Sequence, residues 1–178
     1  MVGEVLSFKR SKEQEPRLTN EELSKLYEEY FPRVYNYVYY RVLNRDLAEE
    51  LVSDIFLRVV RSYHTYDPKK AKFSTWVFRI AHNCLINYYR SRREITDIDQ
   101  VSEGVMSTED SYQEGETDDE RVQRLLTYLN DEERELIYLK FYSEKSNVQI
   151  GELLGMNAST VSTKVSRAVS KMRAHVDG

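Results

Sequence analysis

The stretch from Glu94 to Asp119 is the feature that most constrains how this 178-residue chain can fold. Between Glu94 and Glu120 there are eleven Asp or Glu residues and no Lys or Arg. Such a segment cannot bury enough apolar surface to offset the entropy lost on ordering it. We therefore expect residues 94–119 to form a flexible acidic linker, with a separate small core on each side of it.

Both flanking regions carry apolar residues at the three- and four-residue spacing of helices. Only six Gly and three Pro are present, which leaves little turn chemistry for many short strands. The sequence therefore predicts an all-α protein with two small helical domains, at residues 19–93 and 120–178. A flexible tail over residues 1–18 is expected to precede them.

Capping residues delimit the helices expected in the first domain. Thr19 begins a first helix, in which Pro32 predicts a kink or break. Asp46 is expected to cap a second helix, which runs to about residue 63. After a loop at 66–73, Ser74 is expected to cap a third helix over residues 75–92.

A helix-turn-helix signature lies near the end of the chain. Expected helices over 147–154 and 158–175 flank Gly155, which can take the left-handed turn conformation, and Met156, which fills the core between them. No acidic residue occurs from Leu153 to Ala174. The side chains expected to face DNA, toward base edges or phosphates, are Ser159, Thr160, Thr163, Lys164, Arg167 and Lys171.

A second basic surface lies between Pro68 and Arg93, where seven Lys or Arg and no Asp or Glu occur among several aromatic residues. On a helix, Val77, Ala81 and Cys84 turn inward, whereas His82 falls among the outward-facing residues. Aromatic rings and amides beside cations suit the unstacked bases of a single strand. The residues expected to bind such a strand are Lys72, Phe73, Trp76, Arg79, Asn83, Asn87 and Arg90.

Other functional classes find no support in the sequence. No nucleotide-binding loop, metal-ligand cluster or nucleophile–base pair occurs, so we expect no catalytic activity, no metal and no cofactor. Cys84, as a single cysteine, cannot form an internal disulfide. No leader sequence and no apolar stretch long enough for membrane insertion are recognisable, so a cytoplasmic protein is expected.

Together these motifs resemble a known family. The run from Tyr66 to Arg90, with Phe73-Ser-Thr-Trp76 followed by Phe78-Arg79-Ile-Ala-His-Asn83, is similar to a block of the extracytoplasmic-function (ECF) sigma factors of bacterial RNA polymerase. Residues 46–59 resemble the family's polymerase-binding helix, and residues 155–173 its promoter-reading helix-turn-helix. The resemblance covers about residues 19–176.

The resemblance implies a sigma factor that binds core RNA polymerase and directs it to promoter DNA. A region 2-like domain would open the minus-ten element, and a region 4-like domain would read the minus-thirty-five element. Further implied partners are the clamp of the largest polymerase subunit, the flap region and an anti-sigma factor, and the free protein is expected to be a monomer. The residues expected to dock on the clamp are Glu49, Glu50, Val52, Ser53 and Asp54, where Ser53-Asp54 replaces the family's usual Gln-Glu.

A conventional helix-turn-helix regulator, with a helical sensing or dimerisation domain, is the alternative. Such a regulator is expected to dimerise on a palindromic operator. A ligand-sensing domain has no need of a basic, aromatic-rich helix without acidic residues, so the sequence favours the sigma factor.

Overall fold

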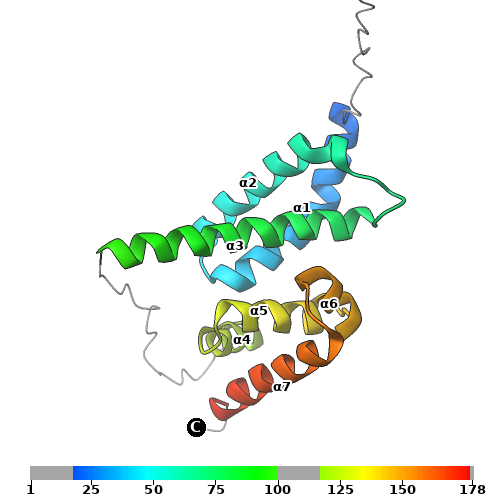
Figure 1. Cartoon of the computed structure of the whole chain (residues 1–178). Coiled ribbons are helices and arrows are strands. Elements are labelled where there is room, and N and C mark those ends of the chain that lie inside the picture. The colour runs from blue at the N-terminus through cyan, green and yellow to red at the C-terminus, as the bar shows by residue number, and fades with distance from the viewer. Residues whose placement is uncertain (1–17, 100–116, 177–178) are drawn as a thin grey trace, which may run out of the picture.

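The computed structural model describes residues 18–99 and 117–176, and within these ranges every regular element is helical (Figure 1). The predicted all-α fold with two helical domains is confirmed. The first domain contains α1 (Asn20–Val42), α2 (Arg45–Ser62), the short η1 (Tyr63–Thr65) and α3 (Phe73–Asp99). The second contains α4 (Asp118–Thr127), α5 (Asp131–Ile137), the π-helical η2 (Tyr138–Tyr142), α6 (Asn147–Leu154) and α7 (Ala158–Ala174). The expected tail, apart from residue 18, and residues 100–116 of the expected linker lie outside the described residues.

The first helix begins as predicted but is not broken. The Thr19 hydroxyl accepts a hydrogen bond from the Glu22 N–H at 3.2 Å, and the Glu22 carboxylate accepts one from the Thr19 N–H at 2.9 Å. This capping box satisfies N–H groups that have no partner within the helix. The prediction at Pro32 was a kink or a break; Pro32 lies inside the continuous α1, so the break does not occur.

The second helix is capped two residues earlier than predicted. The Asn44 side chain, and not Asp46, accepts the hydrogen bond from the Leu47 N–H, at 2.9 Å. Leu43 before it has a positive φ of 52° and ends α1 with its N–H bonded to the Tyr39 carbonyl. The turn between α1 and α2 is therefore tighter than the sequence suggested.

The third helix is longer than predicted at both ends. It begins at Phe73, so Ser74 lies in its first turn, and it continues to Asp99. On the other side of the acidic segment, Thr117 caps α4 through a second capping box. The predicted linker boundaries, at residues 94 and 119, therefore fall inside helices.

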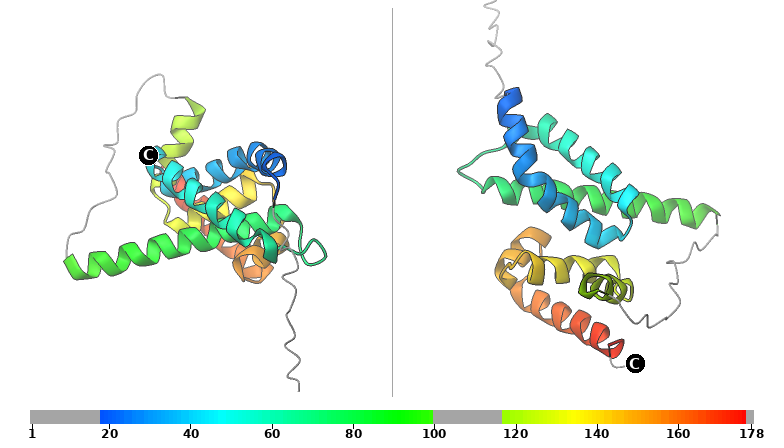
Figure 2. Two further views of the ribbon diagram at one scale, coloured as in Figure 1. Left: turned by 90° about the horizontal axis from the view of Figure 1, so that it is seen from above. Right: turned by 180° about the vertical axis from the view of Figure 1, so that it is seen from behind.

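The two domains form two layers that pack on each other (Figures 1 and 2). The layer of α1, α2 and α3 contacts the layer of α4 to α7 through α1 against α5 and α3 against α6. One buried apolar cluster runs across this contact, joining Val34, Val77 and Phe78 of the first domain to Tyr138 and Leu139 of the second. The expectation of a separate core on each side of the acidic segment was therefore wrong, because the two domains share this cluster.

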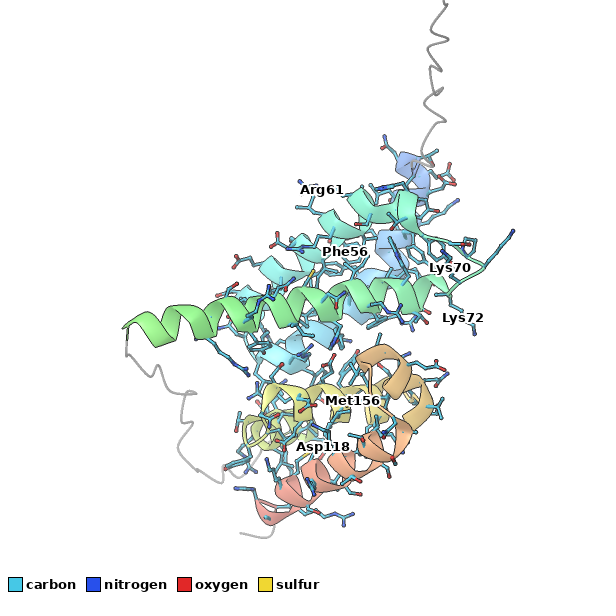
Figure 3. The ribbon with its side chains drawn as sticks, in the orientation of Figure 1. Phe56, Arg61, Lys70, Lys72, Asp118 and Met156 are labelled. Carbon is cyan, nitrogen blue, oxygen red and sulfur yellow. The ribbon has the colours of Figure 1, made fainter. Side chains whose placement is uncertain are left out.

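The helix-turn-helix has the predicted form. Gly155 ends α6 with φ of 69°, and the Asn157 side chain caps α7 by accepting from the Thr160 N–H at 2.9 Å. Met156 between them packs against the core (Figure 3). In the described part of the chain, no helix is both long and apolar enough to cross a bilayer.

Candidate nucleic-acid interface

A stripe of polar side chains runs along one face of α3. Arg79, Asn83 and Arg90 are exposed, and Asn87, half-buried, accepts a hydrogen bond from the Arg90 guanidinium at 3.1 Å. Residues three, four and seven apart share a helix face, so these four predicted side chains lie in one row. Lys72, at the start of the helix, is also exposed (Figure 3).

Phe73 and Trp76 are more buried than most of the other residues predicted to bind a single strand. Both are half-buried, and their ring centroids are 5.5 Å apart. Tyr66 lies against both rings, at 5.2 Å from Phe73 and 5.4 Å from Trp76, and Tyr30 lies 5.2 Å from Phe73. Such aromatic packing stabilises the loop at 66–72 and leaves only part of each ring accessible to a base.

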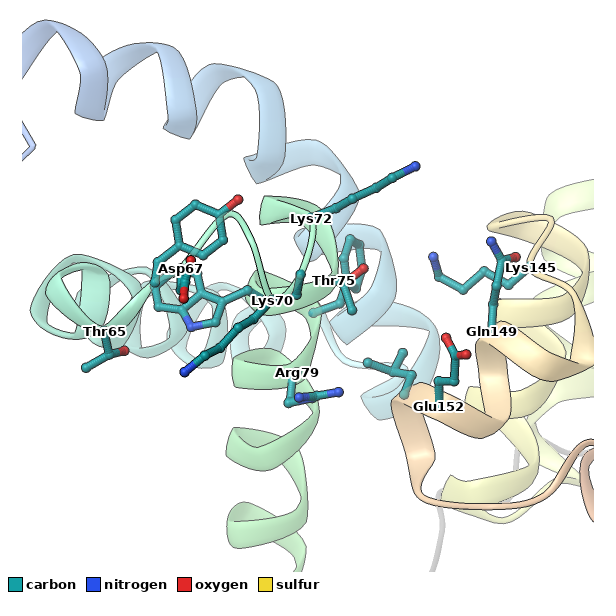
Figure 4. A pocket seen from close by; sticks show the side chains of 14 residues that line it. Thr65, Asp67, Lys70, Lys72, Thr75, Arg79, Lys145, Gln149 and Glu152 are labelled. Atoms are coloured by element: carbon teal, nitrogen blue, oxygen red, sulfur yellow. The ribbon is translucent and has the colours of Figure 1, made fainter.

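A cavity of about 690 Å³ lies between the two domains, beside Trp76 (Figure 4). On the side of the first domain it is lined by Asp67, Lys70, Lys72 and Arg79, among others; from the second domain come Lys145, Gln149, Glu152 and Leu153. Burial lowers the pKa of Lys145, and the nearby Arg33 lowers it further. Lys145 was not predicted from the sequence, because only the packing of the domains brings it to this surface.

His82 does not face solvent as its position on the helix predicted. Its Nδ1 lies 2.8 Å from the Glu135 carboxylate of α5, a residue that is itself buried. The outward-facing assignment of His82 was therefore wrong, because α5 covers this part of α3. Cys84, in contrast, is buried as expected, and burial raises the pKa of its thiol.

The exposed face of α2 holds four of the five residues predicted to bind polymerase. Glu49, Glu50, Ser53 and Asp54 are exposed. The prediction that Val52 binds polymerase was wrong, because its side chain is 0% exposed and packs in the core. Leu57, which is 53% exposed, extends the same face. Its position three residues after Asp54, off the buried stripe of α2, was a signal in the sequence for this role.

The predicted DNA-reading residues on α7 are divided between two faces. Ser159, Thr163 and Arg167, each four residues apart, are exposed in one line opposite the buried Val161 and Val165. The Ser159 and Thr160 hydroxyls both donate to the Asn157 cap, at 2.9 and 2.7 Å. Packing thus leaves one continuous polar line directed away from the core.

Lys164 and Lys171 turn sideways toward α5. The Lys164 ammonium lies 2.7 Å from the Glu132 carboxylate, and that of Lys171 lies 2.5 Å from Glu133. The two lysines therefore each form an ion pair with a neighbouring acid in the same domain. Of the three predicted cations of α7, Arg167 is the one on the outward line.

Two family models match the chain on either side of the acidic segment. The model described as sigma-70 region 2 matches residues 26–95, and the one described as sigma-70, region 4 matches residues 119–172. The first range contains α2 and the α3 stripe, and the second contains the helix-turn-helix.

Curated relatives align over most of the chain. ECF RNA polymerase sigma factor BldN of Streptomyces coelicolor is 31% identical over 150 residues, which cover 82% of this chain and 56% of BldN, so the chain spans little more than half of that relative. RNA polymerase sigma factor YlaC of Bacillus subtilis is 26% identical, with 85% of this chain and 90% of YlaC covered. ECF RNA polymerase sigma factor SigW of Bacillus subtilis is 29% identical, with coverages of 81% and 83%.

Two solved structures have the same fold. Sigma factor RpoE from Bartonella quintana, in complex with the anti-sigma factor NepR, superposes with a TM-score of 0.73 at 22% identity and covers 88% of this chain and 98% of that one. CnrH, in complex with the cytosolic domain of CnrY, gives a TM-score of 0.64 at 20% identity, with coverages of 89% and 90%. At these identities the likeness establishes the architecture.

Proposed function

The chain belongs to the extracytoplasmic-function sigma factors of bacterial RNA polymerase, and on this premise we propose that it directs core polymerase to a specific set of promoters. It would act in the cytoplasm, without catalysing a reaction of its own. The conventional regulator is not favoured, because the sigma-70 region 2 match occupies the part of the chain where a sensing or dimerisation domain would lie.

The single observation that carries this function is the polar stripe on α3 within a domain that also presents an exposed face of α2. Arg79 and Arg90 can bind phosphates, and Asn83 and Asn87 between them can hydrogen bond to the edges of unstacked bases. We assign this stripe, with Lys72, to the minus-ten strand. Trp76 and Phe73 would hold the adjacent loop and offer ring edges to a base.

The α2 face is assigned to core polymerase. Glu49, Glu50, Ser53 and Asp54 would meet the clamp of the largest subunit, and Leu57 would add apolar contact area at the C-terminal end of the patch. Because Ser53 and Asp54 are shorter than the family's usual Gln and Glu, Leu57 would take a larger share of the binding free energy.

The outward line of α7 is assigned to the minus-thirty-five element. A helix that follows a helix-turn-helix turn can enter the major groove with its N-terminal residues against base edges. Ser159 and Thr163 would contact bases, and Arg167 would bind a guanine or a phosphate. Lys164 and Lys171 would contribute only after leaving Glu132 and Glu133.

Further partners follow from family membership. We propose the polymerase flap region as a contact of the second domain, an anti-sigma factor as the inhibitor, and a monomeric free protein. Residues 19–99 would serve as the region 2-like domain and residues 117–176 as the region 4-like domain, with the acidic segment as the connection between them.

Run-off transcription tests this function. Purified core polymerase would transcribe fragmented genomic DNA of the source bacterium with no addition, with this protein, or with its Asn83→Ala variant. New discrete transcripts only with the wild-type protein are expected. Binding of a palindromic site by a stable dimer, with no new transcript, would instead establish the conventional regulator.

A further inference from the structure

A buried polar cluster joins the two domains where α5 meets α1 and α3. Glu135 of α5 is 2% exposed, and its carboxylate accepts a hydrogen bond from the Tyr37 hydroxyl and lies 2.8 Å from His82 Nδ1. The guanidinium of Arg41, which is 1% exposed, lies 3.2 Å from the same carboxylate. Arg41 Nε also donates to Asp131 at 2.9 Å. Two carboxylates of the second domain thus meet a cation, a hydroxyl and an imidazole of the first.

Side chains also donate hydrogen bonds to backbone carbonyls where the domains meet. The Arg134 guanidinium of α5 donates to the Arg41 carbonyl at 2.7 Å, and within the first domain the Tyr89 hydroxyl of α3 donates to the same carbonyl at 3.2 Å. The Tyr138 hydroxyl donates to the Arg33 carbonyl at 3.3 Å. The contact between the domains is therefore specific in its hydrogen bonds as well as apolar.

The electrostatics of the cluster make it sensitive to the loss of one partner. Burial alone would raise the pKa of Glu135, but the hydrogen bond from His82 and the charge of Arg41 outweigh it and leave the pKa below its usual value. Burial and the adjacent Glu135 raise the pKa of Tyr37, which therefore stays a hydrogen-bond donor. Burying a charge without its partner costs much free energy, so the contact between the domains depends on the groups of both domains being present.

The closed arrangement conflicts with simultaneous reading of two promoter elements. Elements near minus ten and minus thirty-five are about 25 base pairs apart, which is roughly 85 Å of B-form DNA. A compact body of this size has a radius of gyration of only about 15 Å. In addition, Gln149 and Glu152 of α6 line the same cavity as Lys72 and Arg79, so the second domain narrows access to the proposed strand-binding surface.

We propose that the face of the first domain formed by Tyr37, Arg41 and His82 is a docking site for α5 of the same chain, and that this contact latches the free protein in a closed form. Asp131 and Glu135 are the groups it recognises. The consequence for promoters rests on the proposed function: the latch must open before both elements can be bound. The apparent affinity for core polymerase is then reduced by the fraction of molecules that are open.

Spin labels on opposite domains measure the latch directly in the full chain. Glu28 of α1 and Ser170 of α7 are exposed, so cysteines there, in a Cys84→Ala background, can carry the labels. Glu135→Gln is the test variant. Glu132→Gln is its matched control, because Glu132 lies on the same helix but pairs with Lys164 inside the second domain.

The wild-type protein and Glu132→Gln should give one narrow distance distribution, and Glu135→Gln should give a broad distribution at longer distances. Unlabelled Glu135→Gln should bind core polymerase about tenfold or more tightly, as expected when a charged hydrogen bond that closes a two-state equilibrium is lost. Should Glu135→Gln fail to fold, Tyr37→Phe provides the same test, since it removes only the hydroxyl that donates to Glu135.

A folded Glu135→Gln or Tyr37→Phe protein with the wild-type distance distribution would overturn the latch. If neither wild-type nor variant chain bound core polymerase, the proposed function would fail, while the distance distributions would still decide whether α5 holds the domains together.

Discussion

Gly151 and Met156 touch backbone to backbone inside the helix-turn-helix: the Met156 N–H donates to the Gly151 carbonyl at 2.9 Å, and a Cβ on Gly151 would collide with the Met156 carbonyl oxygen. We expect Gly151→Ala to lower the free energy of unfolding by about 1–3 kcal/mol, the usual cost of overpacking. Urea denaturation of the full chain measures it.

Gly155 supplies the control for that substitution. It has a positive φ of 69°, but apart from its neighbours in the chain no described atom lies within 4 Å of the position that a Cβ would take. Gly155→Asn should change stability by less than Gly151→Ala, because Asn tolerates the left-handed region. Equal stability of Gly151→Ala and the wild type would show that α6 and the turn can separate without cost.

Arg167 and Lys171 should differ in their contributions to minus-thirty-five binding. Arg167→Ala is expected to weaken binding about tenfold, because its guanidinium lies on the outward line of α7. Lys171→Ala should weaken it less than about threefold, because the ammonium is already paired with Glu133. Fluorescence anisotropy over a salt series also reports the slope, which should fall by about 0.9 for each lost phosphate contact. Equal losses would mean that Lys171 leaves Glu133 freely.

Asn83→Ala should impair promoter opening without weakening core polymerase binding. Asn83 is exposed on α3, so its removal should change the free energy of unfolding by no more than about 0.5 kcal/mol. Permanganate reactivity of thymines at the minus-ten element measures opening. The exposed Asn36→Ala on α1 serves as control and should open promoters normally. Normal opening by Asn83→Ala would place the strand-binding site elsewhere.

Acid should open the contact between the domains. The pKa of Glu135 is below its ordinary value of 4.5 in the folded protein, so its carboxylate stabilises the closed form fully above pH 4.5. This stabilisation is lost as the pH falls through the lowered pKa. The groups that face Glu135 are Tyr37 and Arg41 on α1 and His82 on α3.

The spin-label distances should therefore lengthen below pH 4.5 in the wild-type protein. Glu135→Gln has no carboxylate to protonate, so its distances should not show this acid transition. An identical acid response in both proteins would assign the effect to other groups.

Much of the fold was predictable from neighbouring residues. The Thr19 capping box, the left-handed Gly155, the Asn157 cap and the buried position of Cys84 all depend on side chains no more than about four residues apart, or on one helical stripe. The errors at this level are also local. Asn44 competes with Asp46 for the cap of α2, and α3 continues past Arg93 although acidic residues follow.

The candidate site was only partly predictable. The rows Arg79–Asn83–Asn87–Arg90 and Ser159–Thr163–Arg167 follow from helical spacing alone. The prediction for Val52 failed because it came from the family resemblance. Its position on the helix places it on the buried side of α2. Leu57 and Lys145 were missed because an apolar or basic residue on one helix does not reveal which element lies opposite.

The sequence by itself determined the helices, the turn of the helix-turn-helix and the separation of charge into two basic regions, since these arise from contacts within a few residues. Only the tertiary structure decided which charges meet. His82 finds Glu135 53 residues away, and Lys164 and Lys171 find their acids 32 and 38 residues away. The His82–Glu135 pair forms because packing of the two layers removes both partners from water together. The two lysines meet their acids at partly exposed positions where α7 packs on α5 within the second domain. A linear pattern contains no information on which helix will cover which face.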